Sequence, residues 1–287
     1  MKNTTVLVGI PTLNGPERLD RCLRSVADHT DPTLFKSVKV LVCDDGSTDE
    51  NLKLNKDAIH RAEHLRSAMG LEMLMNERRM GIAATWNRLT RHQTADVVAL
   101  INDDIEVVDD WLDVLVYSVA KNANAGMVSL RSYMGRTKQS HCETYLAGSA
   151  PPVLDYHEAQ LMSGGGTLLA SGGAAFAFRR SRFNAVGGFD ERYRCFYEEV
   201  DFGVAMGEIG LYHYIASYPV LFHLVGATTT DKRNMDASEE MLRSRELFKE
   251  KWGKTPEEIR TTQAAARRHQ ATPVVNEWNS QLKFLKD

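Results

Sequence analysis

Residues 38–49, with the sequence VKVLVCDDGSTD, join a short apolar run to a turn rich in carboxylate and hydroxyl groups. A short, nearly continuous apolar run is typical of a strand that is buried on both faces of a sheet. Such strands form mostly parallel sheets with helices on both sides, and the polar turn marks the carboxyl end of the strand. The segment therefore predicts an α/β fold with a ligand site beside this turn.

Similar apolar runs recur along the chain and alternate with helical patterns. They lie at residues 4–10, 38–43, 72–75, 97–101, 127–130 and 174–178. Between them, residues 16–28 and the segment that begins at Trp111 carry apolar side chains at helical spacing. We predict a Rossmann-like, mostly parallel mixed sheet flanked by helices. Two further helical patterns, at residues 238–252 and 256–269, predict a helical C-terminal part.

Composition and charge exclude several classes of protein. The 287 residues are 43% hydrophobic and 25% charged, which is ordinary for a globular domain and excludes disordered and fibrous classes. The net charge of −3 supplies no overall attraction to nucleic acid or anionic lipid. Cys22, Cys43, Cys142 and Cys195 lie far apart, and no apolar stretch is long enough to span a bilayer. We therefore expect a cytoplasmic protein.

Polar groups follow three of the predicted strands at their carboxyl ends. The segments are Pro11-Thr12-Leu13-Asn14, the turn at residues 44–49 and Asn102-Asp103-Asp104. Each alone is compatible with ordinary turn formers and helix caps. Neither a GxGxxG nor a GxxxxGK[ST] pattern is present, so a Rossmann dinucleotide site and a P-loop are unsupported. A carboxylate-rich crevice would repel a bare diphosphate unless a divalent cation lies between them, which predicts a metal–nucleotide site.

In this order and spacing the segments resemble the family 2 glycosyltransferases, which have the GT-A fold, over most of residues 4–253. The resemblance implies that Asp44 holds the nucleotide base and that Asp104, in a DxD-type motif of NxD form, is the metal carboxylate. It also implies that the segment 76–81 (NERRMG) passes close to the nucleotide. The implied nucleotide-contacting residues are Pro11, Thr12, Asn14, Asp44, Asn76, Gly81, Asn87, Asn102 and Asp103.

The second half of the chain resembles the acceptor side of the same family. The segments GGFDERY (187–193) and FYEEVDFGVAMGEIG (196–210) match its signature, and they imply Glu198, Glu199 and Asp201 as the catalytic acids. Glu199 matches the general base, with Glu198 and Asp201 shaping its environment. The chain departs from the pattern because Glu199 replaces the usual Asp, and because Ala205 or Met206 stands where many members carry Arg. The alternative for Glu198 and Glu199 is a solvated helix start, where acids are favoured by the helix dipole.

His223 stands where some family members have a histidine that completes the metal shell, and KWG at residues 251–253 matches the C-terminal end of the family's domain. The alternative for His223 is a histidine satisfied inside the core. Two arginine pairs, at residues 78–79 and 179–180, are either solvated charges or contacts to a diphosphate.

The resemblance implies a metal-dependent, inverting glycosyltransferase that moves a sugar from a UDP- or TDP-type sugar nucleotide to a hydroxyl group, with Mn²⁺ or Mg²⁺ as the cofactor. The chemistry needs a Lewis acid for the departing diphosphate and a base for the attacking hydroxyl. The acceptor stays open between a glycan, a lipid-linked sugar, a protein side chain and a modified nucleobase. The alternatives are a non-catalytic sugar-nucleotide-binding paralogue and a sugar nucleotidyltransferase.

These segments also predict how the chain is divided. We expect a GT-A domain at residues 1–235, with a nucleotide-binding half at 1–104 and an acceptor half at 105–235. A helical extension would follow at residues 236–287.

Overall fold

A computed structural model describes residues 1–62, 65, 67, 69–134, 173–224, 236–256 and 258–259. Its strands are β1 (Thr5–Thr12), β2 (Ser37–Asp44), β3 (Leu71–Met75), β4 (Val97–Ile101), β5 (Ile105–Glu106), β6 (Ala125–Met134), β7 (Ala175–Arg179) and β8 (Tyr212–His223). Its helices are α1 (Pro16–Asp28), η1 (Pro32–Leu34), α2 (Asp49–Arg61), α4 (Ile82–His92), α5 (Trp111–Lys121), α8 (Arg180–Val186), α9 (Glu198–Glu208) and α10 (Ala237–Trp252).

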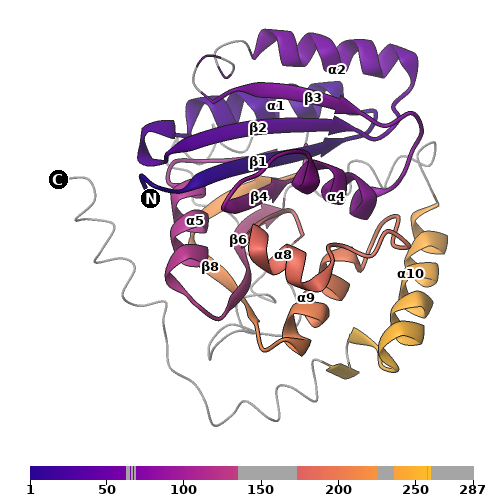
Figure 1. The fold of residues 1–287 in the computed structure, drawn as a ribbon. Helices are drawn as coiled ribbons and strands as arrows, with labels where there is room; N and C mark the ends of the chain where they lie inside the picture. Colours follow the sequence, from indigo (N-terminus) through magenta and orange to yellow (C-terminus); the bar gives the residue numbers. More distant parts are fainter. Residues whose placement is uncertain are drawn as a thin grey trace.

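One sheet in the order β3-β2-β1-β4-β7-β6-β8-β5 runs through the molecule (Figure 1). The strands β3, β2, β1 and β4 are parallel, β7 is antiparallel to both of its neighbours, and β6 and β8 are parallel. The prediction of a mostly parallel mixed sheet flanked by helices is confirmed. The run predicted at residues 127–130 forms part of β6, which lies one strand away from β4 because β7 is inserted between them.

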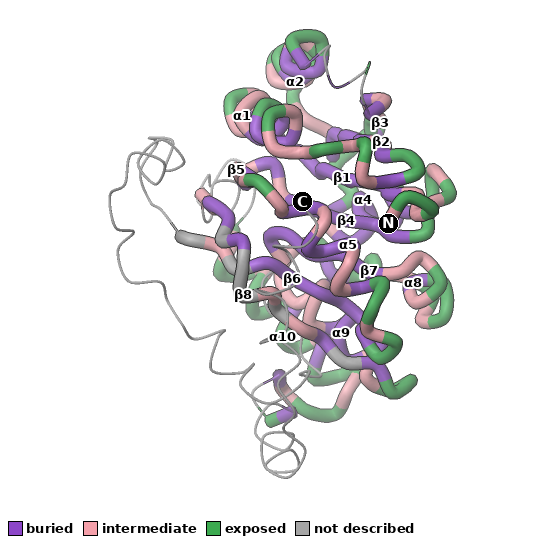
Figure 2. The backbone as a smooth tube through the Cα atoms, turned by 90° about the vertical axis from the view of Figure 1, so that its left-hand side faces the viewer, coloured by how far each residue is buried: buried purple, intermediate pink, exposed green. Residues whose placement is uncertain are grey.

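Helices cover both faces of the sheet because successive side chains of a strand point to opposite faces. Val8 of β1 belongs to the same core cluster as Leu19 and Leu23 of α1, whereas Leu7 shares a cluster with Trp86 and Leu89 of α4. The tube in Figure 2 shows the central strands in the colour of buried residues and the outer turns of α1 and α2 as exposed. The carboxyl ends of the parallel strands lie together at one edge of the sheet.

The helix α10 forms over nearly the same residues as the pattern predicted at 238–252. The Asp236 carboxylate caps it by accepting from the backbone N–H groups of Ser238 and Glu239. In Figure 1, α10 (yellow) lies at the side of α9, and its Phe248 shares a small core cluster with Tyr193 and Val204. Most of the pattern predicted at 256–269, and residues 260–287 as a whole, lie outside the described residues. The division at residue 235 stays a prediction.

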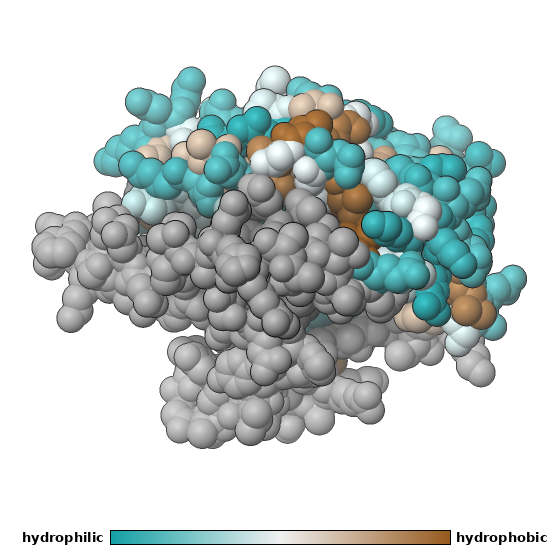
Figure 3. All heavy atoms as spheres, turned by 90° about the horizontal axis from the view of Figure 1, so that it is seen from below, coloured by the Kyte–Doolittle hydropathy of each residue, from teal (hydrophilic) through white to brown (hydrophobic). Residues whose placement is uncertain are grey.

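Within the described residues, no helix is both long and apolar enough to cross a membrane. On the face shown in Figure 3 the described surface is mostly hydrophilic, with hydrophobic side chains near the middle and a smaller group toward the right-hand edge.

Candidate active site

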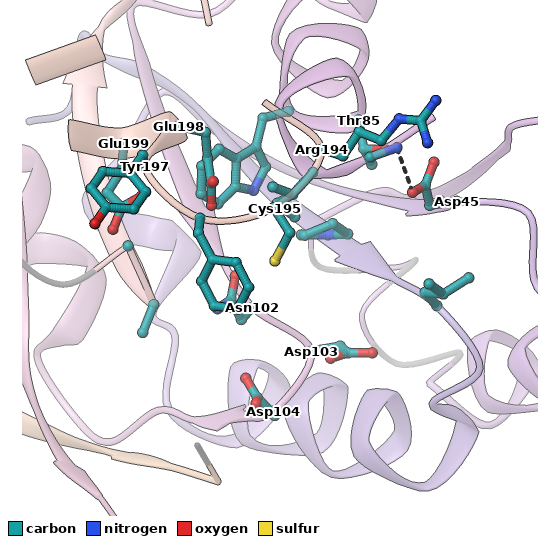
Figure 4. Close-up of a pocket in the computed structure, with 18 of the residues that line it drawn as sticks. Asp45, Thr85, Asn102, Asp103, Asp104, Arg194, Cys195, Tyr197, Glu198 and Glu199 are labelled. Carbon is teal, nitrogen blue, oxygen red and sulfur yellow. Dashed lines mark hydrogen bonds between the residues drawn. The ribbon is translucent and has the colours of Figure 1, made fainter. Parts of the chain in front are cut away.

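A cavity of about 510 Å³ opens at the carboxyl edge of the sheet. Ligand sites commonly measure roughly 300–1,000 Å³, so this volume suits a small molecule of nucleotide size. Its walls come from the ends of β1, β4 and β8, the start of α4, the segment before α9, and Met241 of α10. Figure 4 shows Asp45, Thr85 and Arg194 on one side, Asp103 and Asp104 on a second, and Tyr197, Glu198 and Glu199 on a third.

The structure brings many of the predicted site residues into this one cavity. Those that line it are Pro11, Thr12, Gly81, Asn102, Asp103, Asp104, Glu198, Glu199 and His223. Those that do not are Asn14, Asp44, Asn76, Asn87 and Asp201. The sequence reasoning also missed lining residues, among them Asp45, Thr85, Trp86, Arg194 and Tyr197.

Asp44 faces its own turn, and its neighbour Asp45 faces the cavity. The Asp44 carboxylate is 1% exposed and accepts from the backbone N–H groups of Gly46 (3.1 Å) and Ser47 (2.8 Å) and from Nδ2 of Asn55 (2.7 Å). The Asp45 carboxylate accepts from the backbone N–H groups of Met80 (2.8 Å) and Gly81 (2.9 Å) and lines the cavity. Asp45, and not Asp44, therefore lines the cavity, and the base-holding role of Asp44 stays a prediction.

Three of the predicted asparagines support the walls of the cavity from behind. Asn76 donates to the Asp45 carboxylate at 2.7 Å and so fixes its orientation. Asn87 donates to the Phe189 carbonyl (2.8 Å) and accepts from the Phe189 N–H (2.9 Å), which ties α4 to the GGFDE segment. Asn14 accepts from the Thr48 N–H at 3.0 Å and so holds the turn after β2. None of the three lines the cavity.

Asp103 is engaged by protein groups at the cavity floor. It accepts from Oγ1 of Thr12 at 2.7 Å and forms an ion pair with Arg18 at 3.3 Å. Burial raises the pKa of Asp103, and the nearby Asp104 carboxylate adds to the rise, while Arg18 opposes it. Asp103 thus links the ends of β1 and β4 to α1. A ligand that contacts the Asp103 carboxylate would have to share it with Thr12 and Arg18.

Asp104 and His223 meet at the wall of the cavity. His223 Nε2 lies 3.3 Å from Asp104 Oδ1, and that buried oxygen accepts no hydrogen bond from the described residues. A buried, unpaired carboxylate oxygen beside an imidazole suits a divalent cation, for which both are common ligands. Within the described part of the chain, no group of three or more His, Cys, Asp or Glu side chains is arranged to hold a metal. Asp104 and His223 would supply two protein ligands to such a cation.

The acidic start of α9 closes the third side of the cavity. Glu198 is 7% exposed, and its Oε2 is buried without a hydrogen-bond partner in the described residues. Burial, and next the repulsion of Glu199, raise the pKa of Glu198 well above its ordinary value of 4.5. The alternative of a solvated helix start is therefore wrong for Glu198. Glu199 also lines the cavity, and a Cβ built on Gly173 would lie 3.1 Å from its Cδ.

The third acid of the run, Asp201, faces away from the cavity. It is 2% exposed and contacts α10 through Nζ of Lys251 (2.8 Å) and Nε1 of Trp252 (2.8 Å). Burial raises the pKa of Asp201, and Lys251 opposes part of that rise. Asp201 therefore does not line the cavity, and the prediction that it shapes the environment of Glu199 stays a prediction.

The two arginine pairs differ in where they lie relative to the cavity. Arg179 donates to the Val119 and Ala120 carbonyls, and Arg180 donates to the carbonyls of Thr90 and Gln93, so neither faces the cavity. Arg79 lines the cavity, as does the exposed side chain of Arg194, which no sequence pattern indicated.

Comparison with known sequences gives two findings. The model of the family described as glycosyl transferase family 2 matches residues 7–187. The N-acetylglucosaminyl-diphospho-decaprenol L-rhamnosyltransferase of Mycobacterium tuberculosis is 26% identical over 252 residues, which covers 80% of each chain.

Solved structures of similar fold include the mannosyltransferase PcManGT from Pyrobaculum calidifontis, in complex with GDP-Man and Mn²⁺. Its TM-score is 0.57 at 17% identity, covering 99% of this chain and 81% of that one. S. aureus TarS 1–349 gives a TM-score of 0.55 at 17% identity over 79% of this chain, which spans 61% of that TarS chain. The same TarS fragment is also known in complex with UDP-GlcNAc. At this level of identity the likeness shows a shared fold.

Proposed function

Because the chain belongs to glycosyl transferase family 2 and has the GT-A fold, we propose that it is a metal-dependent, inverting glycosyltransferase that uses a UDP- or TDP-type sugar nucleotide. One observation carries the proposal. The Asp104–His223 pair, the carboxylate of Asp45 and the acids Glu198 and Glu199 all line a single cavity. These are the groups that cation binding, base recognition and proton removal require.

The donor would lie between Asp45 and Asp104. We propose Asp45, in place of Asp44, as the acceptor of a hydrogen bond from the nucleotide base, because its carboxylate is fixed by Asn76 and faces the cavity. Asp104 and His223 would hold the divalent cation. When bound, such a cation neutralises charge on the diphosphate leaving group.

We propose Glu199 as the general base. Burial raises the pKa of Glu198 and so favours its neutral form, which cannot take a proton. Glu199 would accept the proton of the acceptor hydroxyl as that oxygen forms a bond to the anomeric carbon. The bond from the anomeric carbon to the diphosphate oxygen breaks on the opposite face, so the configuration inverts and the diphosphate departs with the electron pair.

Among the acceptor classes, we favour a lipid-linked sugar. The support is the rhamnosyltransferase relative, whose name describes an N-acetylglucosaminyl-diphospho-decaprenol acceptor. The acceptor hydroxyl would approach from the side of Glu199.

A thermal-shift screen tests the donor assignment. The folded chain is heated with UDP, TDP, GDP and their sugar conjugates, in Mn²⁺, Mg²⁺ or EDTA. A ligand at about 100 times its Kd adds about 2.7 kcal/mol of stability, which is easily detected. We expect stabilisation by UDP or TDP compounds in Mn²⁺ that disappears in EDTA. Equal stabilisation by all three nucleotides, or none in the presence of metal, would contradict the donor assignment.

A further inference from the structure

The helix α10 contacts one short segment, residues 195–201, at three points. Ser244 Oγ donates to the Cys195 carbonyl at 2.8 Å, and the Phe248 ring lies 5.9 Å from the Tyr197 ring. The third point is the Asp201 carboxylate, which Lys251 and Trp252 contact. The same segment carries the two acids that face the cavity, so α10 touches it on both sides of those acids.

The segment is strained at the residues that precede the acids. Phe196 and Tyr197 both have positive φ values, 66° and 69°, although neither is glycine. Bulky residues are strained in this region and persist there only when surrounding contacts hold them. The strained pair sets the direction in which the chain enters α9, and hence where Glu198 and Glu199 lie.

The Asp201 contact is the strongest of the three. The Lys251 ammonium lies between two carboxylates, at 2.8 Å from Asp201 Oδ2 and 2.9 Å from Asp190 Oδ2. Trp252 Nε1 donates to Asp201 Oδ1 at 2.8 Å, and the Tyr193 hydroxyl donates to the same oxygen at 3.3 Å. Charge-assisted bonds to a 2% exposed carboxylate are shielded from water, so they resist exchange better than surface pairs.

We propose that Lys251 and Trp252 are positioning residues that hold the first turn of α9, through Asp201, so that Glu198 and Glu199 face the cavity. The inference rests on the proposed function for its effect on catalysis. Its structural part, that α10 maintains the strained segment, is independent of any substrate. Among the described residues, neither Lys251 nor Trp252 lines the cavity.

The position of the contacts that Lys251 and Trp252 make with Asp201 explains why their loss would lower turnover. Asp201 lies one helical turn beyond Glu198, so a shift of the helix start moves both acids together. A displacement of about 1 Å at a reacting group can cost about a hundredfold in rate. Asp45, Asp104 and His223 belong to other elements and would keep their places.

The test compares Lys251→Met and Trp252→Phe with the matched control Lys249→Met. Lys249 is an exposed lysine on the same helix. Hydrogen–deuterium exchange of peptides that cover residues 195–202 reports on the segment without any substrate. UDP affinity in Mn²⁺ is measured by calorimetry. Turnover is measured with whichever UDP- or TDP-linked sugar the unchanged chain consumes fastest.

We expect Lys251→Met and Trp252→Phe to exchange faster than the unchanged chain across residues 195–202. Their kcat should be about tenfold to a hundredfold lower, and their UDP affinity should stay within about twofold. Lys251→Arg, which keeps the charge, should recover most of the rate. Unchanged exchange and kcat in Lys251→Met and Trp252→Phe would overturn the proposal, as would a parallel loss of UDP affinity and kcat. If no sugar nucleotide is consumed by the unchanged chain, the proposed function fails while the exchange measurement still decides the positioning role.

Discussion

His223 is the register partner of Ile105 in the β5–β8 ladder, and this pairing sets its imidazole 3.3 Å from the carboxylate of Asp104. Two residues far apart in the sequence are thus brought together by one short antiparallel contact. The backbone N–H of Leu224 also donates to the Asp104 carbonyl at 3.0 Å, which extends the pairing past the strand ends. Backbone pairing of β5 with β8 therefore holds the two side chains next to each other.

Removal of either member of this pair should weaken nucleotide binding only when metal is present. We expect Asp104→Asn and His223→Ala to lower UDP affinity in Mn²⁺ by tenfold or more. This is roughly the effect of removing a metal ligand or a side chain that supports one. In EDTA the variants and the unchanged chain should bind UDP equally weakly. Calorimetry measures both conditions, with the exposed Asp28→Asn as the control. Variants that keep the full effect of Mn²⁺ would contradict the metal site.

Glu199→Gln should lower kcat by about 10²–10⁴-fold, because a positioned base contributes about that factor. The substitution nearly preserves shape, so UDP affinity should stay within about twofold. Steady-state kinetics of Glu199→Gln and Glu198→Gln, side by side, separate the two acids. A normal kcat in Glu199→Gln together with a large loss in Glu198→Gln would move the base to Glu198.

The buried Glu198 carboxyl should make the stability of the protein depend on pH. Its pKa is raised in the folded state, so its neutral form is favoured by folding, and folding is favoured most below the unfolded value near 4.5. As pH rises from there through the folded pKa, ionisation of the unfolded chain removes that stability. Glu198→Gln cannot ionise, so its stability relative to the unchanged chain should grow with rising pH. Chemical denaturation from pH 4 to pH 8 measures this; a constant difference between the two would contradict it.

The neighbouring acids Asp44 and Asp45 should differ in their effect on binding. We expect Asp45→Asn to lower UDP affinity by about tenfold, the value of one charge-assisted hydrogen bond. Both substitutions weaken two bonds to backbone N–H groups and should lower the melting temperature, but the UDP affinity of folded Asp44→Asn should change little. A thermal melt and a UDP titration of each variant give four numbers. The reverse pattern would return the base-holding role to Asp44.

Gly81→Ala should destabilise the fold more than Gly70→Ala. Both residues have positive φ, 97° and 68°. A Cβ at Gly81 would lie 2.7 Å from the Arg194 Cα, whereas one at Gly70 would meet nothing within 4 Å. Gly70→Ala should therefore lower the free energy of unfolding by about 1 kcal/mol, through its backbone conformation alone. Gly81→Ala should lower it further because of the clash. Urea denaturation measures the difference, and equal free energies of unfolding would contradict it.

The strands of the sheet, and the edge at which the cavity lies, were predictable because each depends on a pattern within a single segment. Apolar runs gave β1, β2, β3 and β4 to within two residues, and helical spacing gave the bounds of α1. Polar residues after parallel strands gather at one edge for a general topological reason, and the cavity lies there.

The choice between adjacent residues was not predictable. Asp44 and Asp45 are identical in type, and which one faces the cavity depends on Asn55 and Asn76, which lie on different elements. Asp201 likewise belongs by sequence to the acidic run, but its partner Lys251 lies on α10, 50 residues further along the chain. Contacts of this kind arise only when distant segments pack.

The antiparallel strand β7 completes a sheet that the first half of the chain leaves open. All five residues of β4, Val97 to Ile101, are buried, and their second ladder partner is β7. During synthesis, β1 to β4 leave the ribosome well before Ala175–Arg179, so β4 is for that interval an apolar strand with a free edge. Free apolar edges pair readily with other chains, and nascent chains on one messenger RNA are close neighbours. The strand order therefore makes the yield of folded protein sensitive to the speed of translation between these two strands and to the holding chaperones present.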